Sequence, residues 1–132
     1  MYKRDLIIAE IQKLGQALKR LMGLQEAGKQ EEADSGLQEV LEQEYGILYT
    51  DLIASEAADF TLFLEEKDFA SEKLEMLSQF LYLKFNPSEK NSENDSLAEK
   101  LQLIYRRLEV KHKVVNMSNL SRQSSIAQYL KA

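Results

Sequence analysis

The sequence contains no cysteine and no tryptophan, and among its 132 residues it has one proline, one histidine and five glycines. Without cysteine the chain can form neither disulfides nor thiolate-based metal or nucleophilic sites, and its redox compartment stays open. The scarcity of proline and glycine favours long helices over a sheet with many tight turns. These absences already point away from most catalytic chemistry and toward an all-helical fold.

Long uncharged stretches are also missing. A membrane-spanning helix needs about 18 or more consecutive apolar residues, and Asp5 and Glu10 interrupt the apolar residues near the N-terminus. No small-residue cleavage site follows them, so we do not predict a signal peptide. We therefore expect a soluble cytoplasmic protein that has no membrane partner.

What the chain does contain is enough apolar material for one core: 44% of its residues are hydrophobic and 30% are charged. A chain of this length fits one domain, so we expect residues 1–132 to form a single all-helical domain. The polar stretch 86–95 holds the only proline, Pro87. We expect it to be a mobile loop inside that domain.

The first 26 residues have the strongest helical pattern. Apolar residues recur there at spacings of four and three, which predicts one buried helix face: Ile7, Ile11, Leu14, Leu18 and Leu21. Gly15 interrupts this helix at a cost of about 1 kcal/mol unless a neighbouring helix approaches closely. Gly28 follows where a C-terminal cap would stand. A second helix at about 29–44 would then return antiparallel to the first.

The rest of the chain predicts four more helices. We expect one within 48–66, one at about 69–85, one that begins at a Ser96–Glu99 capping box, and a short one near 120–130. The helix after the capping box carries a 4-3-4 apolar stripe at Leu97, Leu101, Ile104 and Leu108. The predicted fold is therefore all-α, with about six helices in three antiparallel hairpins.

Residues 26–41 resemble the second helix of a tetratricopeptide repeat through four positions: Gly28, Ala33, Leu37 and Leu41. The resemblance implies a stack of hairpins whose first helices line a concave face. On that face three polar side chains would meet an acidic peptide: Lys13, Gln16 and Arg20. The other hairpins do not repeat the motif, so the alternative is an irregular helical bundle. The layout also resembles small, uncharacterised all-helical bacterial proteins, which implies a bacterial source and no particular activity.

Charge is distributed unevenly along the chain. Residues 1–25 carry a net charge of +3, residues 26–99 carry −14, and residues 100–132 carry +6. Such asymmetry can steer an acidic partner to one end of a molecule. The favoured interpretation is that the basic end pairs with the acidic middle, either within the chain or in a second copy.

The sequence does not predict an enzyme. His112, the only histidine, lies between Lys111 and Lys113 rather than near carboxylates, so we interpret it as a solvated surface residue rather than a metal ligand or a general base. The chain has no phosphate-binding glycine loop, no nucleophile elbow and no EF-hand loop. We accordingly expect no catalytic residue, no cofactor and no bound metal.

The predicted function is a non-enzymatic scaffold or adaptor that displays a helical surface or groove to a protein or peptide, or to its own copy as a homodimer. A second candidate surface is the apolar end of the fourth helix: Phe80, Tyr82, Leu83 and Phe85. The alternative function is nucleic-acid association. It would use a basic strip near the C-terminus: Arg106, Arg107, Lys111, Lys113 and Arg122.

Overall fold

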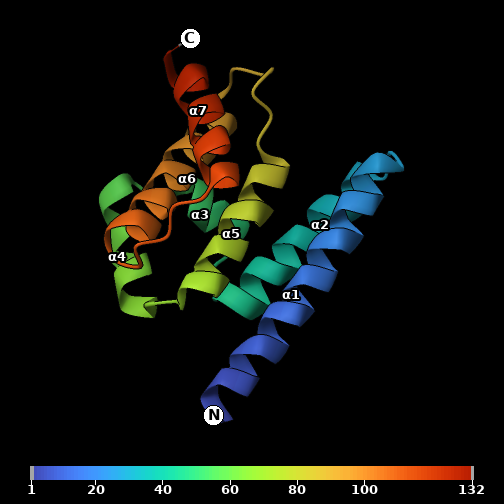
Figure 1. Cartoon of the computed structure of the whole chain (residues 1–132). Coiled ribbons are helices and arrows are strands. Elements are labelled where there is room, and N and C mark those ends of the chain that lie inside the picture. The colour runs from blue at the N-terminus through green and yellow to red at the C-terminus, as the bar shows by residue number, and fades with distance from the viewer. Residues whose placement is uncertain (1, 132) are drawn as a thin grey trace. The chain divides into compact units, whose positions relative to one another are not determined.

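The all-α prediction is confirmed by the computed structural model, which describes residues 2–131 and the side chains from Arg4 to Lys131. Seven α-helices and one π-helical turn make up most of this part of the chain, and no strand occurs in it (Figure 1). The elements are α1 Tyr2–Glu26, α2 Gln30–Val40, η1 Leu41–Tyr45, α3 Tyr49–Ala54, α4 Ala57–Lys67, α5 Ser71–Lys84, α6 Ser92–Val110 and α7 Met117–Lys131.

The internal contacts of the chain divide it into two compact units, one that ends at Tyr49 and one that begins at Thr50. We call them the N-terminal unit and the C-terminal unit, and each is described by itself. That residues 1–132 form one domain stays a prediction.

The N-terminal unit is the predicted helical hairpin. Gly28 adopts a left-handed backbone conformation with φ of +77°, which glycine reaches without the steric penalty of a Cβ atom. The amide of Gly28 donates to the Gln25 carbonyl at 3.0 Å, and the amide of Lys29 donates to the Leu24 carbonyl at 2.8 Å. These bonds end α1 and let α2 pack back along it.

The two helices approach each other closely at Gly36, which the sequence did not single out. Gly36 is buried, and a Cβ atom at that position would overlap the Cδ2 atom of Leu21, which is also fully buried. Leu37 and Leu41 are buried as well, at 3% and 0% exposure. By contrast, a Cβ atom on Gly15 would have no neighbour within 4 Å, so Gly15 is not required for close packing.

The predicted second helix changes geometry before it ends. Regular α-helix stops at Val40, and residues Leu41–Tyr45 form the π-helical turn η1. Gly46 ends the turn in a left-handed conformation with φ of +71°. Tyr45 is buried, and burial is the main reason why the pKa of its hydroxyl is raised far above its ordinary value. Tyr45 therefore acts as a core residue.

In the C-terminal unit α6 is the central helix, because it packs against α4, α5 and α7. All four residues of the predicted stripe are buried, and a second face is buried through Ala98 and Tyr105. The predicted first and third hairpins, α1 with α2 and α6 with α7, are present, and the middle hairpin is the one that differs. The main partner of α5 is α6 rather than α4, and α4 packs against α6 as well.

The single helix predicted within 48–66 is wrong, because the chain breaks it into α3 and α4 at Ser55 and Glu56. The Ser55 hydroxyl donates to the carbonyl of Leu52 at 2.8 Å. Glu56 is extended, with φ of −80° and ψ of 162°, and serves as the N-cap of α4. Serine side chains often compete in this way with the hydrogen bonds of a continuing helix.

The predicted start of the next helix at Ser96 is also wrong. Its N-cap is Asn91, whose side chain accepts a hydrogen bond from the Asn94 amide at 2.8 Å, so residues 92–95 are helical rather than part of the loop. The Ser96 hydroxyl instead donates to the Ile53 carbonyl at 2.7 Å and accepts from the Nζ atom of Lys100 at 3.1 Å. This second bond helps to accommodate Lys100, which is only 1% exposed.

Polar contacts also join the segment after α6 to α5 and to the loop before α6. On α5, the Glu75 carboxylate accepts from the side chain of Asn116 at 2.8 Å, just before α7 begins. Lys90, in the loop before α6, donates to the Tyr129 carbonyl on α7 at 3.2 Å and pairs with Asp95 at 3.3 Å. These polar contacts join elements of the C-terminal unit. Ion pairs between the basic end and the acidic middle are formed by Arg107 and Lys111 with Asp68.

Candidate functional site

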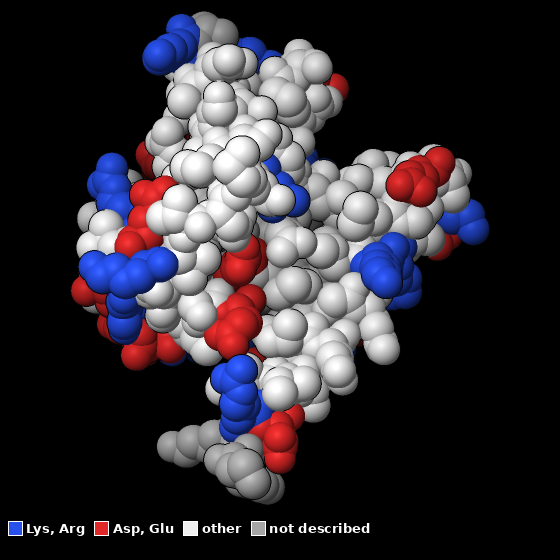
Figure 2. All heavy atoms as spheres, in the orientation of Figure 1, with Lys and Arg blue, Asp and Glu red and all other residues white. Residues whose placement is uncertain are grey.

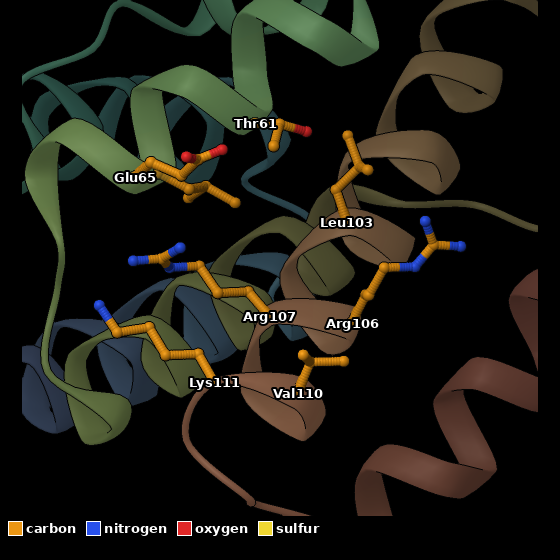
Figure 3. Close-up of a pocket in the computed structure, with 8 residues that line it drawn as sticks. Thr61, Glu65, Leu103, Arg106, Arg107, Val110 and Lys111 are labelled. Carbon is orange, nitrogen blue, oxygen red and sulfur yellow. The ribbon is translucent and has the colours of Figure 1, made fainter.

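A groove of about 290 Å³ lies in the C-terminal unit between α4 and α6 (Figure 3). We call it the α4–α6 groove. It is lined by Thr61, Leu64, Glu65, Leu103, Arg106, Arg107, Val110 and Lys111. The lining from α6 follows helical spacing, since residues 103, 106, 107, 110 and 111 are three or four positions apart and so share one face. The groove thus combines apolar side chains with three cations.

One end of the groove is cationic. The Arg107 Nη2 atom donates to the Asp68 Oδ1 atom at 3.0 Å, and the Lys111 Nζ atom donates to the same oxygen. Figure 3 shows Arg107 and Lys111 extending to the same side of α6. The Lys111 ammonium, and to a lesser extent the Arg107 guanidinium, lowers the pKa of the Asp68 carboxyl. Asp68 therefore stays ionised and links the C-terminal end of α4 to α6.

Two features of the cations leave hydrogen-bonding capacity unused. The Nε atom of Arg107 is buried, although it has no hydrogen-bond partner among the described residues. A carboxylate commonly engages arginine through two parallel hydrogen bonds, whereas Asp68 uses one nitrogen of Arg107. Arg106 extends away from Arg107, to the opposite side of the groove in Figure 3, and its residue is exposed. The exposed Arg106 is therefore the cation at which the groove can accept further negative charge.

The apolar part of the groove is partly open to solvent. Leu64 is buried at the base and Leu103 is half-buried, whereas Val110 is 65% exposed. Side chains of this kind, next to cations, suit a partner that buries apolar surface and carries acidic groups.

His112 borders the cationic end and is not the solvated surface residue that the sequence indicated. It is half-buried, and its Nε2 atom is buried without a hydrogen-bond partner in the described structure. Burial and, next, the positive charges of Arg107 and Lys111 lower the pKa of its imidazole. The ring is consequently held neutral at pH values where a free histidine would begin to take up a proton.

We expect this histidine to make the folded state less stable as pH falls below about 6.5, the ordinary histidine pKa. Because the pKa is lower in the folded chain, the unfolded chain binds the proton first, and stability is lost as pH falls from the unfolded toward the folded value. His112 is the only histidine. Replacing it in His112→Gln should therefore reduce the difference in melting temperature between pH 7.5 and pH 5.5, measured by circular dichroism.

An equal loss of stability in the wild-type chain and in His112→Gln across that interval would contradict the assignment. Aspartates and glutamates have ordinary pKa values near 4 and lysines near 10, so they contribute little between pH 5.5 and 7.5.

The predicted basic strip is divided by the fold. Arg106, Arg107 and Lys111 line the α4–α6 groove, but Lys113 and Arg122 do not. Lys113 is exposed in the connection between α6 and α7. Arg122 lies over the ring of Tyr82, with 5.5 Å from its guanidinium carbon to the ring centroid.

The three predicted residues of α1 belong to the N-terminal unit. Lys13 and Arg20 line a smaller cavity of about 150 Å³ beside α2, and Gln16 lines a separate hollow along α1. Lys13 forms an ion pair with Glu44 at 2.7 Å, and this contact raises the pKa of the lysine. Two carboxylates, Glu39 and Glu44, line this cavity beside the two cations, whereas one carboxylate, Glu65, lines the α4–α6 groove beside three cations. The cavity is therefore less suited to an acidic peptide than the groove.

The apolar end of α5 lies largely inside the C-terminal unit. Phe80 and Phe85 are 0% and 6% exposed, and the ring of Phe85 packs edge-on against Tyr129 with a centroid distance of 5.0 Å. These two side chains are part of the core and do not present a docking surface. Tyr82 and Leu83 are half-buried.

The surface over α7 differs in character from the groove. Uncharged atoms cover most of the α7 surface that faces the viewer in Figure 2, and Arg122 and Lys131 are the only charged residues in the helix. It exposes Met117 and Leu120, which are 82% and 44% exposed. Apolar and strongly cationic side chains therefore come together at the α4–α6 groove rather than on α7.

Within residues 2–131, no group of three or more histidine, aspartate or glutamate side chains is placed to hold a metal ion. None of the helices described there combines the length and apolar character needed to cross a membrane.

Comparison of the chain with protein families, curated proteins and solved structures gives no match. The tetratricopeptide resemblance of the α1–α2 hairpin therefore stays a prediction, and the functional argument depends on the groove itself.

Proposed function

We propose that this chain is a non-enzymatic protein-interaction module and that its α4–α6 groove binds an acidic amphipathic helix of a partner protein. The observation that carries the proposal is the presence of Leu64, Leu103 and Val110 in the same groove as three cations. An amphipathic helix presents apolar side chains at i, i+3, i+4 and i+7. Acidic residues beside that stripe would meet Arg106 on one side and Arg107 with Lys111 on the other.

The size of the groove supports a peptide rather than a buried small molecule. Its volume of about 290 Å³ is at the lower limit of cavities that enclose drug-sized ligands, which span roughly 300–1,000 Å³. Val110 is also 65% exposed at its rim. A helix that covered the groove would bury Val110 and would place only a few anchoring side chains between α4 and α6.

Nucleic acid is the alternative partner, and the exposed Arg106 favours it in part. Glu65 in the groove and Asp68 beside its cations repel phosphate and an acidic helix alike, so the apolar lining is what separates the two partners. Nucleic-acid interfaces depend mainly on phosphate neutralisation, and apolar Leu64 and Val110 contribute nothing to that. The division of the basic strip, with Lys113 and Arg122 outside the groove, also disfavours a continuous phosphate track.

The test is a titration of the purified chain with three labelled probes, read by fluorescence anisotropy. The first is a 20-residue amphipathic helix with leucines at i, i+3, i+4 and i+7 and flanking glutamates, the second has glutamine at the glutamate positions, and the third is a 20-nucleotide single strand. We expect saturable binding of the first probe and weaker binding of the second. Equal binding of both peptides, or preferential binding of the nucleic acid at 0.15 M salt, would contradict the proposal.

A second copy of the chain is the remaining occupant to be tested. Light scattering over a range of protein concentrations measures the mass directly. We expect added acidic peptide to bind without changing the protein's own association state. If the protein forms a dimer that the acidic peptide dissociates, the groove is covered by a second copy instead.

A further inference from the structure

We infer that Asp68 competes with the partner for the cations of the groove. The Asp68 carboxylate occupies the position that an acidic side chain of the partner takes on binding. This inference rests on the proposed function, since it assigns a regulatory contact to the same groove. Asp68 does not line the groove itself, but its carboxylate bonds both Arg107 and Lys111, which do.

The geometry of the contact supports replacement by an incoming carboxylate. A single oxygen of Asp68 receives both donors, while the buried Nε atom of Arg107 has no hydrogen-bond partner among the described residues. A carboxylate that arrives from the groove can present two oxygens, one to the Nη2 atom of Arg107 and one to the Nζ atom of Lys111, the two atoms that share one oxygen of Asp68. Asp68 thus neutralises the cations without using their full hydrogen-bonding capacity.

The position of Asp68 in the chain also allows it to leave the cations. Its side chain is 58% exposed, so its carboxylate can return to water without crossing a packed core. Exposed ion pairs of this type are weak and are screened by salt. Asp68 caps α4 in a left-handed conformation with φ of 48°, which aspartate and asparagine tolerate better than most residues. Its carboxylate can therefore be removed by substitution with little effect on the turn.

The charges around the contact favour an anion at this point whether Asp68 or a partner supplies it. The positive charges of Arg107 and Lys111 lower the pKa of the His112 imidazole, and the negative charges of Asp68 and Glu72 raise it. When Asp68 leaves, Arg107 and Lys111 lie close together without the anion that bridges them. Two neighbouring cations without an anion between them attract a new carboxylate. Release of the Asp68 carboxylate and binding of a partner carboxylate are therefore coupled.

The experiment compares the wild-type chain with Asp68→Asn, which keeps the shape and backbone preference of the residue but removes its charge. Binding of the glutamate-flanked helix is measured by fluorescence anisotropy, with the glutamine-flanked helix as the control probe. We expect Asp68→Asn to bind the glutamate helix about three- to fivefold more tightly, an effect typical of one exposed ion pair, and to bind the glutamine helix unchanged. Circular dichroism confirms that the variant is folded.

A second measurement follows Asp68 in the wild-type chain by carboxyl carbon NMR. Its pKa is depressed in the free protein because Lys111 and Arg107 contact it. We expect saturation with the glutamate helix to return this pKa toward the ordinary aspartate value, since the partner then holds both cations. A fixed structural ion pair would keep the depressed pKa in the complex.

The outcomes separate the two proposals. If wild-type chain and Asp68→Asn bind the glutamate helix equally, the groove functions but Asp68 is not a competitor. Weaker binding by Asp68→Asn would show that Asp68 positions Arg107 and Lys111 for the partner, which also overturns the inference. If neither protein binds the glutamate helix, both the proposed function and the inference are wrong.

Discussion

Charge reversal in Arg107→Glu is expected to weaken binding of the glutamate-flanked helix by about tenfold to a hundredfold, because it removes one hydrogen-bonding cation and adds repulsion next to the ligand. Arg107 is the more buried member of the cationic pair, since its side chain is 15% exposed and that of Lys111 is 45% exposed. Fluorescence anisotropy at fixed salt gives the change in Kd. Circular dichroism checks that the variant retains its helices.

The matched control is Lys113→Glu, which makes the same change in net charge outside the groove. Lys113 is exposed and does not line the α4–α6 groove. We expect its effect on Kd to be about twofold or less, from long-range electrostatics alone. Equal losses in the two variants would show that net charge, rather than this site, attracts the peptide.

Replacement of Gly36 by valine is expected to destabilise the chain by about 2–3 kcal/mol, which is typical of overpacking in a tight interface. The first added carbon already overlaps Leu21 Cδ2, and Leu21 is 0% exposed, so it has little room to turn away. Valine adds two more carbons at the same point. Urea denaturation followed by circular dichroism measures the free energy of unfolding.

The control for this substitution is Gly15→Ala in α1. A Cβ atom at that position has no neighbour within 4 Å, so we expect the gain in helix propensity alone, up to about 1 kcal/mol of added stability. If Gly36→Val does not lower the free energy of unfolding relative to Gly15→Ala, the α1–α2 hairpin is packed more loosely than the structure shows.

Much of the fold follows from local sequence patterns. The spacing of Leu97, Leu101, Ile104 and Leu108 predicts a buried helix face, and all four are buried. Gly28 predicts the turn between α1 and α2, where it adopts its left-handed conformation. Such features depend on residues a few positions apart, which is the range over which helical periodicity and capping act.

The errors arise where local signals compete. Ser55 ends α3 through a bond to the Leu52 carbonyl, although the apolar spacing continues through it. Asn91 and Ser96 are both suitable N-cap residues, and the chain uses Asn91 because Ser96 bonds to Ile53 and Lys100 instead. Ile53 is 43 residues away in sequence, so local propensity does not reveal this choice.

The groove was only partly predictable for the same reason. Its cations stood out as a basic cluster in the sequence, but Thr61, Leu64 and Glu65 come from α4. Asp68, which pairs with two of the cations from outside the groove lining, is the C-terminal cap of that helix. Asp68 lies 39 positions from Arg107. It belongs to the charged stretch 65–68, where the local pattern predicts only a helix end. The packing of α4 on α6 brings these residues together, and neither helix alone encodes that contact.

The most direct test of the central claim is methyl NMR of the chain labelled at leucine and valine, titrated with the glutamate-flanked helix. We predict the largest shift changes at Leu103 and Val110, which line the α4–α6 groove, and little change at Leu14 and Leu21 in the α1–α2 interface. Largest changes at Leu14 and its neighbours on α1, or none at Leu103 and Val110 at saturating peptide, would contradict the assignment of this groove as the docking site.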